Sequence, residues 1–134
     1  MSNAPSVFKW EGGTISAHRT AGAALTVAYG LDYDTSGNLV LADSTRKSCV
    51  GIAMNTYASG DTGVRAHKGG RSLVATTGTC KAKDHMKVSS TPGVFTTDGT
   101  SGSTAVDTAS AGSTIGVLVE DADADGYALM EWLR

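Results

Sequence analysis

Two short apolar runs, each with a glycine at its centre, constrain the fold of this chain most. Residues 49–54 surround Gly51 and residues 114–119 surround Gly116, and a polar segment follows each run. Apolar runs of this length favour buried strands, because a helix needs roughly ten or more periodic residues. A glycine inside a strand is typical of a bulge, a bend or the close approach of another backbone. The two runs therefore predict two similar β units that close on one small core.

The composition supports a chain of many short strands. The 134 residues suit one domain, and 17 of them are glycine whereas only 2 are proline. Charged residues make up 18%, which is below the roughly 25% of typical domains. Such a mixture favours strands joined by tight turns rather than collagen-like or proline-rich disordered structure.

Local patterns place further strands along the chain. Residues 31–41 predict a strand, a turn and a strand, because apolar positions flank the turn-forming residues 34–38. Residues 64–67 and 73–75 predict a hairpin closed by Lys68-Gly69-Gly70. The second half repeats this rhythm at 86–88, 94–95 and 127–133, with a polar surface loop expected at 97–113. No segment has the pattern of an amphipathic helix. We predict an all-β fold, a small β-barrel-like or β-sandwich-like domain of two loosely repeated β units.

The N-terminal residues carry apolar side chains that need an explanation. Val7, Phe8 and Trp10 precede Gly12-Gly13, although termini that are not tied down are usually polar. One interpretation is that this segment packs as a first strand of the domain. The other is an extended arm, residues 1–13, that orders on a partner and precedes a single β domain at 14–134. In an extended segment Phe8 and Trp10 share one face, and Val7 and Lys9 share the other.

Charge and hydropathy exclude several classes of partner. The net charge is −2 and the pI about 5.8, which gives no global electrostatic support for nucleic-acid binding. No apolar run approaches the roughly 20 residues that cross a bilayer, so we expect no membrane partner. The N-terminus lacks the basic and apolar regions of a secretion signal, so we expect synthesis in the cytoplasm. Cys49 and Cys80 are expected to be free thiols, with Cys49 buried.

The acidic segment Asp121-Ala-Asp123-Ala-Asp125-Gly126 is the strongest candidate for chemistry. Alternating acids before a glycine are typical of calcium loops, in which several oxygens surround a hard cation. The pattern also requires a Glu at its twelfth position, and Trp132 stands there. A solvated acidic β-turn is therefore the preferred interpretation, and a small calcium- or ligand-binding β module is the alternative.

The remaining candidate motifs predict neither catalysis nor metal binding. Ser44-Thr45-Arg46-Lys47 has the spacing of some acyl-transfer enzymes but lacks their other motifs. The histidines at 18, 67 and 85 have no spacing for shared metal ligation. Basic residues straddle the hairpin expected at 64–75 and form either a local patch or a solvated turn: Arg65, His67, Lys68 and Arg71. We expect no catalytic residue, no metal and no cofactor.

Several short motifs together resemble a known family. Residues 32–42 (DYDTSGNLVLA), 50–53 (VGIA), Gly69-Gly70 and Leu73-Val74 resemble the head-decoration, or capsid cement, proteins of tailed phages. The second-half run ending in residues 115–118 (IGVL) is similar to the longer members of that group. The resemblance covers about residues 14–133.

The resemblance implies a non-enzymatic structural virion protein. It implies a compact β-barrel-like domain and a homotrimer, and its partner would be the major capsid protein on the outer surface of the expanded head. Family members commonly engage the capsid through an N-terminal segment. By position, Val7, Phe8 and Trp10 would belong to this capsid-binding arm.

Overall fold

The fold consists of two antiparallel sheets and is all-β in the part of the chain described here. A computed structural model describes residues 5, 7–45, 48–98 and 114–133. The strand order is β1-β7-β11-β10-β8-β9 in the six-stranded sheet and β2-β6-β5-β3-β4 in the five-stranded sheet. The strands are, in chain order, β1 (Trp10–Glu11), β2 (Thr14–Arg19), β3 (Gly30–Tyr33), β4 (Leu39–Leu41), β5 (Gly51–Ala53), β6 (Val64–Lys68), β7 (Arg71–Ala75), β8 (His85–Val88), β9 (Phe95–Thr97), β10 (Gly116–Leu118) and β11 (Tyr127–Trp132).

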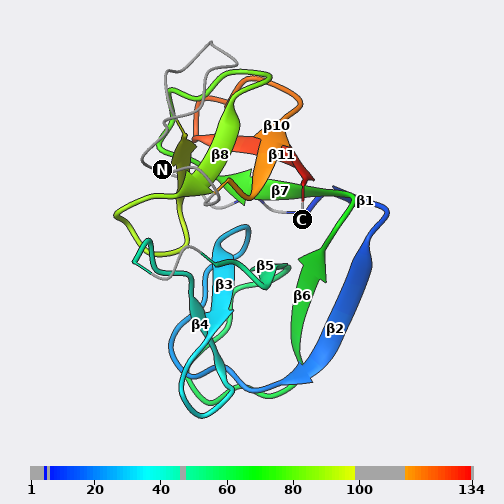
Figure 1. Cartoon of the computed structure of the whole chain (residues 1–134). Coiled ribbons are helices and arrows are strands. Elements are labelled where there is room, and N and C mark those ends of the chain that lie inside the picture. The colour runs from blue at the N-terminus through cyan, green and yellow to red at the C-terminus, as the bar shows by residue number, and fades with distance from the viewer. Residues whose placement is uncertain (1–4, 6, 46–47, 99–113, 134) are drawn as a thin grey trace.

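The all-β prediction is confirmed, and of its two forms the sandwich-like one describes the molecule. The two sheets lie one above the other in Figure 1, and each has two edge strands, so neither closes into a barrel. Within the described residues, no helix has the length and apolar character needed to cross a membrane. Of the surface loop expected at 97–113, residues 99–113 lie outside the described part.

The two sheets contain two five-stranded units with the same topology. In the first unit, β2–β6, the pairs are β2 with β6, β6 with β5, β5 with β3, and β3 with β4. In the second unit, β7–β11, the pairs are β7 with β11, β11 with β10, β10 with β8, and β8 with β9. The loose repeat expected from the sequence is therefore a repeat of strand order and pairing.

The units also match in register. Gly51 in β5 lies opposite Leu31 in β3, and Gly116 in β10 lies opposite Met86 in β8. Outside the named strands, a parallel bridge joins Ala21 to Leu39 in the first unit and Thr76 to Phe95 in the second. Residues at equivalent positions can therefore be compared directly between the units.

The two glycine-centred runs are strands, as predicted, and Gly116 shows why a glycine is needed. A Cβ at Gly116 would overlap the Glu131 carbonyl oxygen and would lie 2.8 Å from Met130 Cγ. Any side chain there would push β10 away from β11. The close approach of another backbone, one of the three expectations for these glycines, is therefore confirmed at Gly116.

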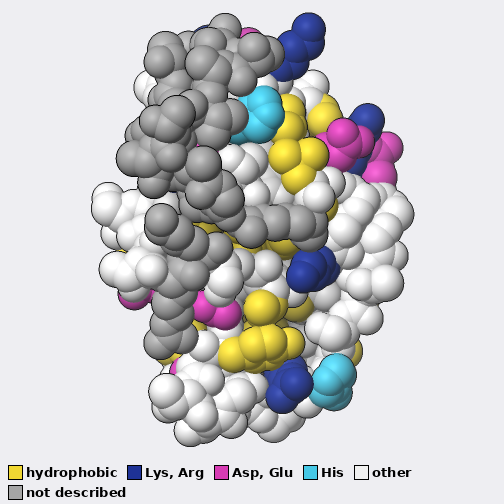
Figure 2. Space-filling model, in the orientation of Figure 1, with side chains coloured by type: hydrophobic (Ala, Val, Ile, Leu, Met, Phe, Trp, Pro, Cys, Tyr) yellow, Lys and Arg dark blue, Asp and Glu magenta, His cyan; other side chains and the backbone are white. Residues whose placement is uncertain are grey.

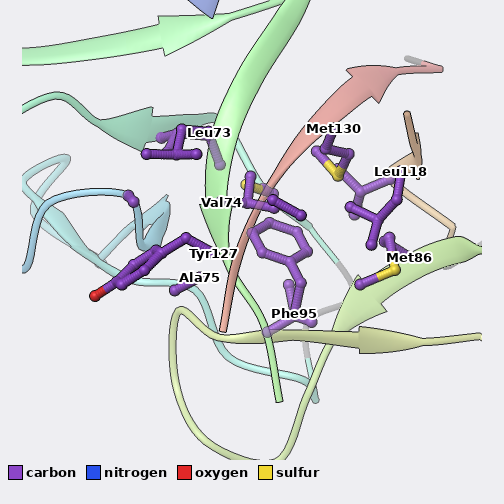
Figure 3. Packing of buried hydrophobic residues seen from close by; sticks show 14 of the residues in the cluster. Leu73, Val74, Ala75, Met86, Phe95, Leu118, Tyr127 and Met130 are labelled. Atoms are coloured by element: carbon purple, nitrogen blue, oxygen red, sulfur yellow. The ribbon is translucent and has the colours of Figure 1, made fainter. Parts of the chain in front are cut away.

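Apolar side chains form a large cluster and a smaller one. The large cluster lies mainly around the six-stranded sheet, and Figure 3 shows Phe95 among Val74, Met86, Leu118 and Met130. The small cluster belongs to the first unit and includes Leu31, Ala53 and Ala66. These three residues occupy the positions of Met86, Leu118 and Met130 in the second unit. The first unit therefore has smaller core residues at two of these positions.

One predicted hairpin is wrong. Residues 64–67 and 73–75 are strands, but β6 belongs to the five-stranded sheet and β7 to the six-stranded sheet. Gly69 and Gly70, with φ of 83° and 55°, carry the chain from one sheet to the other. The remaining predicted strands, including the hairpins β3–β4 and β8–β9, are confirmed.

Candidate functional site

The N-terminal residues expected to form an arm lie beside β7, at the edge of the six-stranded sheet. Trp10 is paired with Ser72, and the Leu73 amide donates to the Lys9 carbonyl at 2.9 Å. Phe8 and Trp10 stack with ring centroids 6.1 Å apart, so they share a face as the extended geometry predicts. Phe8 is only 7% exposed, whereas Trp10 is 44% and Val7 68% exposed.

Residues 8–11 pack against the domain, as in the interpretation of this segment as a first strand, and the division into an arm at 1–13 and a domain at 14–134 stays a prediction. Phe8 lies in the large apolar cluster, because burying its ring against other apolar side chains removes it from water. The capsid contact of Val7, Phe8 and Trp10 stays a prediction. Only Val7 and Trp10 offer a substantial exposed surface for it, and residues 1–4 and 6 lie outside the described part.

Two glycine pairs bring both sheets together at one corner. Gly12-Gly13 joins β1 to β2, and Gly69-Gly70 joins β6 to β7 beside it (Figure 1). All four residues have positive φ, and a Cβ at Gly13 would lie 2.5 Å from the Lys68 carbonyl oxygen. We call these four residues the glycine corner. It requires glycine both for its backbone conformation and for the close contact of the two crossings.

A series of buried hydrogen bonds links the glycine corner to the neighbouring strands. His67 Nε2 lies 2.7 Å from the Gly12 carbonyl oxygen, which can only accept, so this nitrogen donates. In the neutral ring Nδ1 then accepts from Ser72 Oγ, and Ser72 Oγ accepts from Trp132 Nε1 at 2.7 Å. The network connects β6, β7 and β11 to the residue that follows β1.

We interpret this network as structural. A serine hydroxyl that donates to a histidine resembles an activated nucleophile. However, both His67 and Ser72 are completely buried, and a carbonyl group rather than a carboxylate accepts from the other ring nitrogen. The side-chain polar atoms of His67 and Ser72 all have partners within this network, which fixes β1 and β2 around the corner.

The outer edge of β2 is an open backbone surface of the first unit. All six residues of β2 are exposed, and β2 pairs only with β6 among the described strands. Its register with β6 is regular over Thr14–Ser16 and shifts by a bulge before Arg19. Edge strands of this kind present unpaired N–H and C=O groups to another chain.

A shallow hollow of about 350 Å³ lies beside this edge. We call it the β2 hollow. Its lining residues come from β2, β3, β6 and the segment before β5: Thr14, Ile15, Ser16, Tyr33, Val50, Ala66 and Lys68. Most of these side chains are small or uncharged. The hollow therefore suits an apolar or mixed contact beside a strand edge.

The charge around the β2 hollow is basic. Lys68 lines the hollow and has no ion pair among the described residues. Arg19 lies over the Tyr33 ring at 5.0 Å and donates to the Gly37 carbonyl at 3.5 Å. In Figure 2, hydrophobic side chains lie between lysine or arginine side chains on the half of the molecule that holds the five-stranded sheet.

The basic patch considered for residues 65–71 does not form as one surface. His67 is buried, and Arg71 bridges two acids, Glu11 at 3.4 Å and Glu131 at 3.6 Å. Because these ion pairs are exposed, each contributes little to stability. Lys68 is the member of the expected patch that lines a hollow.

A second hollow of about 370 Å³ lies next to the N-terminal segment. Its lining residues include Val7 and Lys9 from that segment, and Leu73, Asp123 and Tyr127 from the domain. Burial raises the pKa of the Tyr127 phenol, and nearby Tyr29, Asp125 and Asp123 act in the same direction. The phenol therefore remains a neutral hydrogen-bonding group at physiological pH.

The acidic segment forms a turn whose carboxylates bind backbone amides. Asp123 Oδ1 accepts from the amides of Asp125 and Tyr127, both at 2.9 Å. Asp121 Oδ1 accepts from the Ala82 amide at 2.9 Å. Within the described residues, no three His, Cys, Asp or Glu side chains are grouped as a metal would require. These bonds support the preferred interpretation, an acidic β-turn.

Comparison with protein-family models and with curated proteins found no match to this chain. Sequence reasoning missed β2 and its hollow, because Thr14–Arg19 alternates weakly and lacks a long apolar run. The sequence does contain one signal, namely two glycine pairs, Gly12-Gly13 and Gly69-Gly70. Each pair joins a strand of one sheet to a strand of the other.

Proposed function

We propose that the protein is a structural component of a virion that binds the outer surface of a tailed-phage capsid and stabilises the expanded head. The family resemblance supports this proposal, and it brings a homotrimer and the major capsid protein as partners. The observation that carries it is the form of the described surface. It offers an open strand edge and two shallow hollows, which suit protein contact better than the enclosed pockets of small-molecule sites.

The N-terminal segment contributes to the proposed contact through its exposed side chains. Val7 and Trp10 face opposite sides of the segment, whereas Phe8 anchors it to the domain. A trimer would present three such segments, and three weak contacts made together bind far more tightly than one. Phe8 therefore supports the contact surface instead of forming it.

Co-sedimentation with phage shells tests the proposal. The folded protein should sediment with expanded shells assembled from tailed-phage capsid proteins and not with unexpanded shells. Trp10→Ala should reduce shell occupancy while circular dichroism remains that of an all-β protein. Lys81→Ala, at an exposed residue remote in sequence from the segment, is the matched control and should sediment normally. Absence of binding to every expanded shell tested would contradict the proposal.

The calcium- or ligand-binding alternative is tested separately. The described oxygens of Asp121 and Asp123 already accept backbone hydrogen bonds, so a cation would compete with them. Binding to the folded state alone raises stability. A melting temperature that is equal with calcium and with a chelator supports the virion proposal over this alternative.

A further inference from the structure

Equivalent edges of the two units differ in whether a strand covers them. In the second unit the outer edge of β7 is covered by β1, through the pairs Trp10–Ser72 and Glu11–Arg71. The equivalent strand of the first unit is β2, and no described strand covers its outer edge. The molecule thus contains one filled and one open copy of the same edge.

The side chains beside the two edges also differ in size, because they are large beside the covered edge and small beside the open edge. In the second unit a row runs from Trp10 through Ser72 and Met130 to Leu118. In the first unit the equivalent row begins at Ser16 and continues through Ala66 to Ala53. Methionine and leucine are replaced by two alanines, and the position of Trp10 is empty among the described residues. The β2 hollow lies over Ser16 and Ala66.

We propose that β2 binds an extended segment of a partner protein, which pairs antiparallel with Thr14–Ser16 as β1 pairs with β7. A large apolar side chain of that segment, placed opposite Ser16 as Trp10 is placed opposite Ser72, fills the β2 hollow. Main-chain hydrogen bonds supply affinity in such an added strand, and the hollow supplies specificity. Because β1 itself pairs over two residues, the three regular residues of β2 are long enough.

The charge of the hollow adds a second feature to the partner segment. Lys68 occupies the position that Trp132 has in the second unit, beside the glycine corner. Its ammonium group has no described acidic partner. An acidic residue two positions after the large apolar one would lie opposite Thr14, on the same face of the sheet as Lys68, and would pair with it. The segment is therefore extended, apolar at one position and acidic two positions later.

This inference rests on the proposed function only for the name of the partner, which would be the major capsid protein. The edge itself is tested with a synthetic peptide of the sequence Val-Phe-Lys-Trp-Glu-Glu, which copies residues 7–11 and has a glutamate two positions after the tryptophan. Added to isotope-labelled full-length protein, it should shift the amide resonances of Thr14–Ser16 and Lys68. Shifts confined to Ser72 and Arg71 would mean that it only displaces β1. That result, or no shift at millimolar peptide, overturns the proposal.

Peptide variants identify the interactions. Replacing the tryptophan of the peptide by serine should weaken binding about tenfold, because an anchoring aromatic side chain carries much of the affinity of such contacts. Replacing its last glutamate by lysine should weaken binding to the native protein and restore it to the Lys68→Glu variant. Equal affinity of all three peptides would overturn the proposed roles of the hollow and of Lys68.

A protein variant that fills the hollow tests the same idea from the other side. Ala66→Met introduces the residue that the second unit has at this position and should reduce peptide affinity about tenfold. Ala58→Met, at an exposed loop residue, is the matched control and should bind normally. If Ala66→Met does not fold, the Lys68→Glu exchange alone decides. A fully folded Ala66→Met that binds with native affinity counts against the hollow.

Shell binding separates this inference from the proposed function. Wild-type protein that binds the peptide at β2 but no shell would leave the edge established and refute the capsid proposal. If wild-type protein and its Ala66→Met and Lys68→Glu variants bind shells equally well, the proposed role of the β2 edge is refuted and the capsid proposal stands. Self-association that the peptide inhibits would show that the bound segment comes from a second copy of this chain, and would overturn the assignment to another protein.

Discussion

Replacing Phe8 by alanine should destabilise the domain even though the residue lies near the N-terminus, two positions before β1 begins. The phenylalanine is 7% exposed and contacts the rings of Trp10 and His67, with centroids 6.1 and 6.2 Å away. A buried aromatic side chain removes roughly 150–250 Å² from water. At about 25 cal/mol per Å² this burial corresponds to about 4–6 kcal/mol, which is an upper value because unfolded chains already bury some surface. Alanine retains part of the contact, so we expect a loss of about 3 kcal/mol, at the lower end of measured Phe→Ala substitutions.

Urea and thermal denaturation of the full chain measure this effect. A loss of about 3 kcal/mol should lower the melting temperature by about 10 °C in a domain of this size. Val7→Ala is the matched control, because Val7 is the adjacent residue and is 68% exposed. Its effect should stay within about 0.5 kcal/mol. If Phe8→Ala is also within 0.5 kcal/mol of the native protein, Phe8 does not pack in the core, and residues 1–13 act as a separable arm.

Three further predictions concern the corner, the acidic turn and a buried thiol. Gly70→Ala should lower the free energy of unfolding in urea by about 1–3 kcal/mol, and by more than Gly60→Ala does. Both glycines have positive φ, but only at Gly70 would the methyl group meet another backbone segment. Equal losses would refute the role of the close crossing. Replacing Asp121, Asp123 and Asp125 by asparagine should retain the fold, since the amide oxygen accepts the same backbone hydrogen bonds. Calorimetry that detects micromolar calcium binding by the native protein but not by this variant would contradict the turn interpretation. Burial raises the pKa of the Cys49 thiol from 9.0 to about 11, so the unfolded chain loses this proton first and the free energy of unfolding should fall by up to about 3 kcal/mol between pH 9 and pH 11. Cys49→Ala should remove this part of the pH dependence, and an unchanged slope would refute it.

The strands predicted from the sequence are those whose pattern is local. Leu31 and Tyr33 alternate with acidic residues, and an apolar run resumes at Leu39. Asp34 fixes the turn between them by accepting from the amides of Ser36 and Asn38. The side chains that determine β3 and β4 are therefore close together in the chain. The same holds for β8 and β9. Burial of Cys49, a short apolar residue before Gly51, follows from the apolar run around it.

The candidate site was missed because distant residues determine it. A pair of glycines with positive φ can close a hairpin or carry the chain between sheets, and Gly69-Gly70 does the second because β7 pairs with β11 and β1. The exposed strand β2 has no buried face to impose alternation on its sequence. No local pattern predicts the hydrogen bonds of His67, since its partners Gly12 and Ser72 lie 55 residues before it and 5 residues after it.

The repeat itself explains why one edge is filled and the other open. Two units of equal topology have two equivalent outer edges, β2 and β7, but among the described strands only β1 lies next to one of them, the edge of β7. Because Gly12-Gly13 turns the chain sharply at the corner, the residues before it continue along β7 and cannot fold back along β2. The core residues follow this difference: Met130 packs beneath the covered edge, and Ala66 leaves a hollow beneath the open one. The open edge therefore follows from the order of the strands in the chain, and among the described residues no second segment covers it.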